Sequence, residues 1–123
     1  MARILVVEDS GTNMMLALTL LESAGHTVLQ ADRALLGIEL ARSEAPDLIL
    51  MDVQMPGMDG IEATRILKGD ARTSAIPVIA LTAFAMKGDR ERMLAAGFDS
   101  YIEKPIDYLA FLAQVAAICE RAR

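Results

Sequence analysis

The sequence predicts a single α/β domain in which five strand–helix units form a doubly wound parallel sheet. Short apolar runs, each the length of one strand, alternate along the 123 residues with longer segments whose apolar residues recur at helical spacing. Three of the five runs are apolar at nearly every position, which is typical of strands that helices cover on both faces of a sheet. Because no linker-like tract or internal repeat interrupts the alternation, we expect residues 1–123 to form one domain.

Strands are predicted where the apolar runs occur. In chain order these runs are Ile4–Val7, Thr27–Gln30, Leu48–Met51, Val78–Leu81 and Ser100–Ile102. Ligands of doubly wound sheets bind beyond the carboxyl ends of the strands, so the residues that follow these runs are the first candidates for a functional site.

Helices are predicted between the strands, from apolar residues spaced i, i+4 and i+7. Three such sets are expected to face the core, namely Met14, Leu18 and Leu21; Ala34, Ile38 and Ala41; and Phe111, Val115 and Ile118. Signals that end a helix follow the first four helical segments, namely Gly25, Ala45–Pro46, Gly69–Asp70 and Gly97.

Composition and charge exclude several classes of protein. The 12 basic and 17 acidic residues give a net charge of -5, which argues against binding to a nucleic acid. Cys119 is the only cysteine, so no internal disulfide or multi-cysteine metal cluster can form, and a cytoplasmic protein is expected. No apolar stretch approaches the ~20 residues of a membrane span, and residues 1–9 carry charges, so neither a membrane span nor a signal peptide is expected.

Polar residues follow four of the predicted strands. Glu8 and Asp9 come after the first, Asp52 after the third, Thr82 after the fourth and Lys104 after the fifth. Since the carboxyl ends of parallel strands meet at one edge of the sheet, we expect the five side chains to converge. Three carboxylates in one place repel each other unless a cation lies between them, and oxygen donors suit a hard ion, for which Mg²⁺ is the best candidate.

This set of residues is suited to phosphoryl chemistry. The Asp52 carboxylate can act as a nucleophile and form an aspartyl phosphate, while the metal and the Lys104 ammonium neutralise the transferring group. The Thr82 hydroxyl can donate a hydrogen bond to a phosphoryl oxygen. Thr82 is therefore expected to respond to phosphorylation.

In their sequence context these residues resemble the receiver domain of two-component response regulators. The matching segments are Val7-Glu8-Asp9, Leu50-Met51-Asp52-Val53-Gln54-Met55-Pro56-Gly57-Met58-Asp59-Gly60, Leu81-Thr82-Ala83 and Lys104-Pro105. The resemblance covers the whole chain and implies a flavodoxin-like, CheY-like (βα)5 fold with strand order 2-1-3-4-5. It also implies that Asp52 is the phosphoacceptor and that Thr82 and Lys104 contact the phosphoryl group.

The resemblance further assigns a metal site and a switch. It implies that Mg²⁺ is bound by Asp9, by Asp52 and by the main-chain carbonyl of Gln54, with Glu8 acting mostly through water. Many receivers have Asp at the position of Glu8, so the water-mediated part of the metal site is expected to differ. Tyr101 is implied to turn inward when Thr82 moves toward the phosphoryl group.

Two local features also follow from the resemblance. The Lys104–Pro105 peptide bond is expected to be cis. Phe84 lies two residues after Thr82, where some receivers carry a polar group that orients the hydrolytic water, so we expect slow self-dephosphorylation.

Two further segments, Thr82–Asp89 and Glu103–Ile106, resemble the DivK-type single-domain regulators of cell division. We therefore expect a signalling protein, not an enzyme, that receives a phosphoryl group on Asp52 from a sensor histidine kinase or a histidine phosphotransferase. Without an output domain it is expected to act in trans on a downstream protein or kinase. The expected contact is the face formed by the fourth helix, the fifth strand and the fifth helix, and neither nucleic acid nor membrane is an expected partner.

One alternative remains open, and the residues argue against two others. The chain could be a receiver module excised from a hybrid histidine kinase or a larger regulator. An aspartyl phosphatase of similar fold would carry Asp-x-Asp at the nucleophile, whereas Asp52 is followed by Val53 and Gln54. An FMN-binding flavodoxin-like module would need a hydroxyl-rich phosphate loop in place of Glu8-Asp9-Ser10.

Overall fold

Strands and helices alternate through the computed structural model, which describes residues 2–83 and 87–121. The strands are β1 (Arg3–Val7), β2 (Thr27–Ala31), β3 (Leu48–Asp52), β4 (Val78–Thr82) and β5 (Ser100–Glu103). The helices are α1 (Gly11–Ser23), α2 (Ala34–Glu44), α3 (Gly60–Lys68), α4 (Lys87–Ala96) and α5 (Tyr108–Arg121). Each predicted strand is present and is one residue longer than predicted: β1 starts one residue earlier, at Arg3, and the other four end one residue later.

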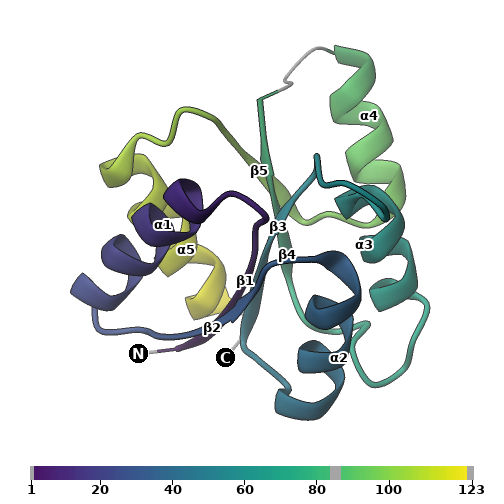
Figure 1. The fold of residues 1–123 in the computed structure, drawn as a ribbon, viewed down its shortest axis with the longest axis horizontal. Coiled ribbons are helices and arrows are strands. Elements are labelled where there is room, and N and C mark those ends of the chain that lie inside the picture. The colour runs from purple at the N-terminus through teal and green to yellow at the C-terminus, as the bar shows by residue number, and fades with distance from the viewer. Residues whose placement is uncertain (1, 84–86, 122–123) are drawn as a thin grey trace.

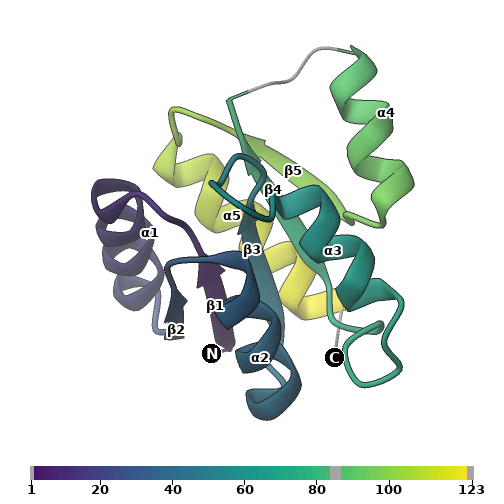
Figure 2. The same ribbon diagram turned by 45° about the vertical axis from the view of Figure 1, so that its right-hand side comes forward.

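The strands form one parallel sheet in the order β2-β1-β3-β4-β5, with helices on both faces (Figures 1 and 2). The predicted fold class and strand order are therefore confirmed. The chain starts at the centre of the sheet, adds β2 on one side and then builds outward through β3, β4 and β5 on the other. The reversal of direction lies between β1 and β3, so this topology predicts a ligand site at the carboxyl ends of those two strands.

Two apolar clusters form the core, one on each face of the sheet. Alternate residues of the central strands point to opposite faces. On one face Leu5 and Met51 pack with α2, α3 and α4, and on the other Val6 and Leu50 pack with α1 and α5. Burial on both faces explains why β1, β3 and β4 are apolar throughout most of their length.

The predicted core face of α1 is wrong at one position. The buried residues of this helix are Met14, Ala17 and Leu21, whereas Leu18 is only half-buried. Spacings of i, i+3 and i, i+4 both fit a helix with 3.6 residues per turn, and α1 has apolar residues on several faces, so the pattern could not choose between them. The sets predicted for α2 and α5 are fully buried as expected.

The helices end where the sequence signals indicate. Gly25 and Gly97 follow α1 and α4 with φ angles of 90° and 105°, a left-handed conformation that glycine adopts without strain. At the end of α2 a non-glycine residue, Ala45, takes this role with φ of 44°. None of the helices in residues 2–83 and 87–121 is long and apolar enough to cross a bilayer.

Candidate functional site

Four strand ends place five polar side chains at the carboxyl edge of the sheet. Glu8 and Asp9 follow β1, Asp52 ends β3, Thr82 ends β4, and Lys104 follows β5. Because β1, β3, β4 and β5 are neighbours in that order, residues far apart in sequence meet at this edge.

The three carboxylates form a compact acidic group. One carboxylate oxygen from each of Glu8, Asp9 and Asp52 lies within 4.8 Å of the other two. Glu8 and Asp52 are 2% and 3% exposed, respectively, whereas Asp9 is exposed to solvent. The group therefore has two buried members and one member at the surface.

Lys104 connects the two buried carboxylates. Its Nζ donates a hydrogen bond to Glu8 Oε2 at 3.1 Å and lies 3.3 Å from Asp52 Oδ1. Burial acts to lower the pKa of Lys104, but the hydrogen bond to Glu8 and the charges of Asp52 and Glu8 outweigh it and raise that pKa. Lys104 is therefore held as an ammonium ion at the position where a transferring anion would need one.

The pKa of Asp52 is raised to about 7, first because the carboxyl is buried and then because it shares a hydrogen bond with Glu8 and is repelled by its charge. Lys104 and the Gln54 main-chain N–H, which donates to Asp52 Oδ1 at 3.1 Å, oppose this shift. The surroundings of Asp52 thus disfavour its negative charge. Binding of a divalent cation or a proton neutralises that charge and is therefore favoured.

The start of α3 fixes the main chain around Asp52. The Asp59 side chain accepts a hydrogen bond from Glu62 N at 2.9 Å and caps the helix. Gly60 N donates to Val53 O, and a Cβ added at Gly60 would lie 2.2 Å from the main-chain oxygen of Asp52. Gly60 is thus a residue of the site that sequence reasoning missed, because the close approach of helix and strand depends on tertiary packing.

The structure describes the other predicted site residues except Phe84. Thr82 is buried at the end of β4, and Tyr101 is half-buried on the neighbouring strand β5. The Lys104–Pro105 peptide bond is cis. Gln54 lies in the exposed turn after β3, and Phe84, on which the expectation of slow self-dephosphorylation rests, is outside the described residues.

The donor set fits a hard divalent cation. All three members of the acidic group offer carboxylate oxygens, and one of them is open to solvent, as suits an ion such as Mg²⁺ that keeps several waters. A cavity of about 360 Å³ opens beside the group, between the loops that follow β1 and β2. Its lining residues are Glu8, Asp9, Gly11, Met14, Gln30, Asp32, Arg33 and Leu36.

Comparison with known proteins places this geometry in a family. Residues 4–116 match the family model of the response regulator receiver domain. The chain is 45% identical over 112 residues to the polar-differentiation response regulator DivK of Brucella anthropi, a match that covers 91% of each chain, and equally to its counterpart in Brucella ovis.

Solved structures give the same result. The receiver domain of a sensor histidine kinase from Pseudomonas aeruginosa is 35% identical, with a TM-score of 0.84, and the match covers 98% of this chain and 95% of the other. That structure is described as having a magnesium ion coordinated in its active site cleft. The receiver domain of a histidine kinase from Syntrophus aciditrophicus is 33% identical, with a TM-score of 0.90 and coverage of 98% and 91%.

Proposed function

Because this chain belongs to the response regulator receiver family, we propose that it accepts a phosphoryl group on Asp52 and changes its affinity for a protein partner as a result. The observation that carries the proposal is the contact of Lys104 with both buried carboxylates, Glu8 and Asp52, beside a third carboxylate at the surface. A cation and a cation-binding acidic group around one buried carboxylate are what phosphoryl transfer to that carboxylate requires.

Each residue of the site has a role in this proposal. Asp52 is the nucleophile, and its attachment to β3 and the packing of Gly60 fix its position. Asp9, Asp52 and the Gln54 carbonyl would hold Mg²⁺, with Glu8 acting through water. When bound, the ion neutralises charge on the phosphoryl oxygens. Lys104 supplies a second positive charge 3.3 Å from Asp52 Oδ1, and the hydrogen bond to Glu8 keeps that ammonium in place.

Signal output is proposed to start at Thr82. Thr82 ends β4, one residue after Leu81, which pairs with Asp52 at the end of the neighbouring strand β3. Movement of Thr82 toward the phosphoryl group leaves space that the ring of Tyr101, on the adjacent strand, can enter. The charge that phosphorylation adds is thereby converted into a change of shape on the face formed by α4, β5 and α5.

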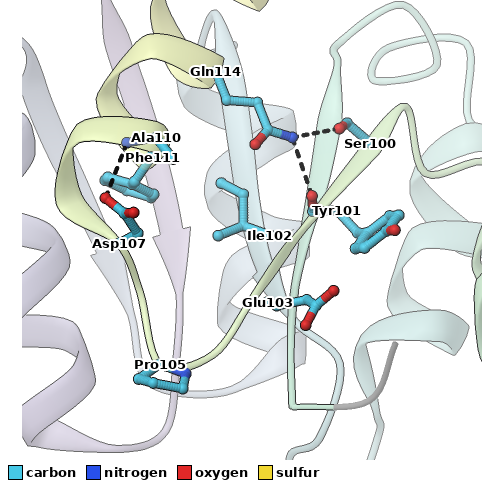
Figure 3. A pocket seen from close by; sticks show the side chains of 9 residues that line it. All are labelled: Ser100, Tyr101, Ile102, Glu103, Pro105, Asp107, Ala110, Phe111 and Gln114. Carbon is cyan, nitrogen blue, oxygen red and sulfur yellow. Dashed lines mark hydrogen bonds between the residues drawn. The ribbon is translucent and has the colours of Figure 1, made fainter. Parts of the chain in front are cut away.

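A cavity on that face supports it as the partner surface. About 500 Å³ opens between β5 and α5, lined by strand residues and by the first turns of the helix (Figure 3). The lining residues are Ser100, Tyr101, Ile102, Glu103, Pro105, Asp107, Ala110, Phe111 and Gln114. The main chain of Tyr101 forms part of this wall, so a movement of β5 that follows phosphorylation would change the cavity, and a downstream protein or kinase could detect it.

The relatives suggest the context of the signal. A histidine kinase or a histidine phosphotransferase is the proposed phosphoryl donor, because receiver domains of kinases are among the similar structures. The identity to DivK, at 45% over 91% of both chains, supports a role in polar differentiation or cell division, and a receiver module of a larger kinase is the alternative.

Chemical trapping tests the assignment of the phosphoacceptor. The protein is incubated with acetyl phosphate and Mg²⁺ and then reduced with borohydride, which converts an aspartyl phosphate into homoserine. We expect peptide mass spectrometry to find homoserine at position 52. Homoserine at another carboxylate, or none in a protein shown to be phosphorylated, would contradict the assignment.

A further inference from the structure

The ring of Tyr101 is in contact with a cation from the neighbouring helix. The guanidinium carbon of Arg90, on α4, lies 5.3 Å from the centroid of the Tyr101 ring. This distance is within the ~6 Å over which a cation is attracted to the face of an aromatic ring. The contact therefore connects α4 to the side chain that is proposed to report phosphorylation.

The main chain of Tyr101 is held separately, from α5. Gln114 Nε2 donates to the carbonyl of Tyr101 at 3.0 Å and to Ser100 Oγ at 2.6 Å. In Figure 3 the Tyr101 side chain points away from Gln114 and from the cavity between β5 and α5. The main chain of Tyr101 is thus held from α5, whereas its ring lies against Arg90 of α4 and packs on the apolar cluster of that face.

We propose that Arg90 is a positioning residue that holds the Tyr101 ring toward α4 and so favours the unphosphorylated conformation. This inference rests on the proposed function and adds a residue that sets the equilibrium between the two positions of the Tyr101 ring. When the ring turns inward it leaves the guanidinium, and the contact with Arg90 is lost. Removing the cation should therefore favour the inward conformation, by about two- to five-fold in population, which is the size of an exposed cation–ring contact.

The test is a titration with beryllium fluoride and Mg²⁺, using beryllium fluoride as a stable mimic of the phosphoryl group. The chain has two tyrosines and no tryptophan, so in a Tyr108→Phe background the tyrosine fluorescence comes from Tyr101 alone. In this background Arg90→Met removes the charge and keeps the length of the side chain, whereas Arg90→Lys keeps the charge. A matched control is Arg65→Met, which removes an arginine from the exposed surface of α3.

A ligand that binds only the active conformation has a midpoint that falls as that conformation becomes more populated. We expect Arg90→Met to lower the beryllium fluoride midpoint by about two- to five-fold, and Arg90→Lys to stay closer to the wild type. An unchanged or higher midpoint for Arg90→Met, or an equal fall for Arg65→Met, would overturn the inference.

Fluorine NMR of the protein-bound beryllium fluoride separates this inference from the proposed function. Absence of a bound signal in the wild type would show that the phosphoacceptor role has failed. A bound signal in every variant, abolished by Asp52→Asn, together with equal midpoints, would leave the phosphoacceptor role standing and refute the role of Arg90 alone.

Discussion

At the scale of single residues, burial and a neighbouring carboxylate disfavour the charged form of Asp52, and the Lys104 ammonium compensates for part of this effect. Asp52 is buried next to a second buried carboxylate, Glu8, and this arrangement raises its pKa to about 7. A balanced ion pair has no excess charge to attract a further ion. This cluster has three carboxylates and one ammonium, so it is short of positive charge. The shortage makes the site receptive to a divalent cation.

The raised pKa of Asp52 has a consequence for stability in metal-free buffer. Its folded pKa, about 7, lies above the ordinary value of 3.8, so the stabilising contribution is complete below about pH 4 and is lost as the pH rises to about 7. Asp52→Asn cannot ionise and escapes this loss. The measured quantity is the unfolding free energy of Asp52→Asn minus that of the wild type. We expect this difference to be ~2 kcal/mol larger at about pH 8 than at about pH 4.5.

Urea unfolding in the presence of EDTA measures this difference. Asp47→Asn, at the opposite edge of the sheet, is the control for replacing an Asp that does not belong to the acidic group. An advantage of Asp52→Asn that is the same at both pH values would contradict the explanation.

Lys104 is expected to matter for chemistry more than for folding. Lys104→Met removes the ammonium that lies 3.3 Å from Asp52 Oδ1, so negative charge on the incoming phosphoryl group is less well neutralised. We expect the rate of phosphorylation by acetyl phosphate to fall about 100- to 1,000-fold, which is the typical effect of losing one preorganised electrostatic partner.

Lys68 provides a matched control for that variant. Its side chain is 21% exposed, as is that of Lys104, and it also forms an ion pair, with Asp99, but it lies at the end of α3 away from the acidic group. Lys68→Met should lower the unfolding free energy and leave the phosphorylation rate of the folded protein unchanged. Equal rates for the two variants would show that Lys104 has no special role.

At the scale of secondary-structure elements, the junction between β3 and α3 determines where Asp52 lies. Gly60 begins α3 so close to the end of β3 that an added Cβ would lie 2.2 Å from the Asp52 main-chain oxygen. We expect Gly60→Ala to lower the unfolding free energy by ~1–3 kcal/mol through this overpacking and to slow phosphorylation as the loop shifts.

Gly11 is the matched control, because it also begins a helix and no heavy atom lies within 4 Å of the Cβ that would be added there. Gly11→Ala should be neutral or stabilising by up to ~1 kcal/mol. Denaturant unfolding of both variants measures the contrast, and equal effects would show that close packing at Gly60 is unimportant.

The elements themselves were predictable from the sequence to different degrees. Continuous apolar runs determined the strands, because burial on both faces leaves few polar residues in β1, β3 and β4. The core face of α1 was not determined, since Ala17 and Leu18 are both apolar and adjacent. The convergence of Asp52, Thr82 and Lys104 followed from the strand topology. The hydrogen bond between Glu8 and Lys104 did not, because it joins residues 96 positions apart and depends on how their side chains pack.

At the scale of the whole molecule, the fold separates stability from function. Two apolar clusters cover the faces of the sheet and fix the strands, while the polar residues proposed to carry chemistry lie at the carboxyl edge and on β5. β1 and β3 are paired at the centre of the sheet, so the main chain that carries Glu8 and Asp52 is held between neighbouring strands. The edge strand β5 connects this edge to α4 and α5, so under the proposed function a change at Asp52 reaches the proposed partner face through two neighbouring strands, β4 and β5.

The most direct test of the central claim is the intact mass of the protein after incubation with acetyl phosphate, with and without Mg²⁺, for the wild type and for Asp52→Asn. We predict that the wild type gains the mass of one phosphoryl group only when Mg²⁺ is present and that Asp52→Asn gains none. A gain that persists in Asp52→Asn, or one that does not depend on Mg²⁺, would contradict the assignment of Asp52 and the acidic group as the phosphorylation site.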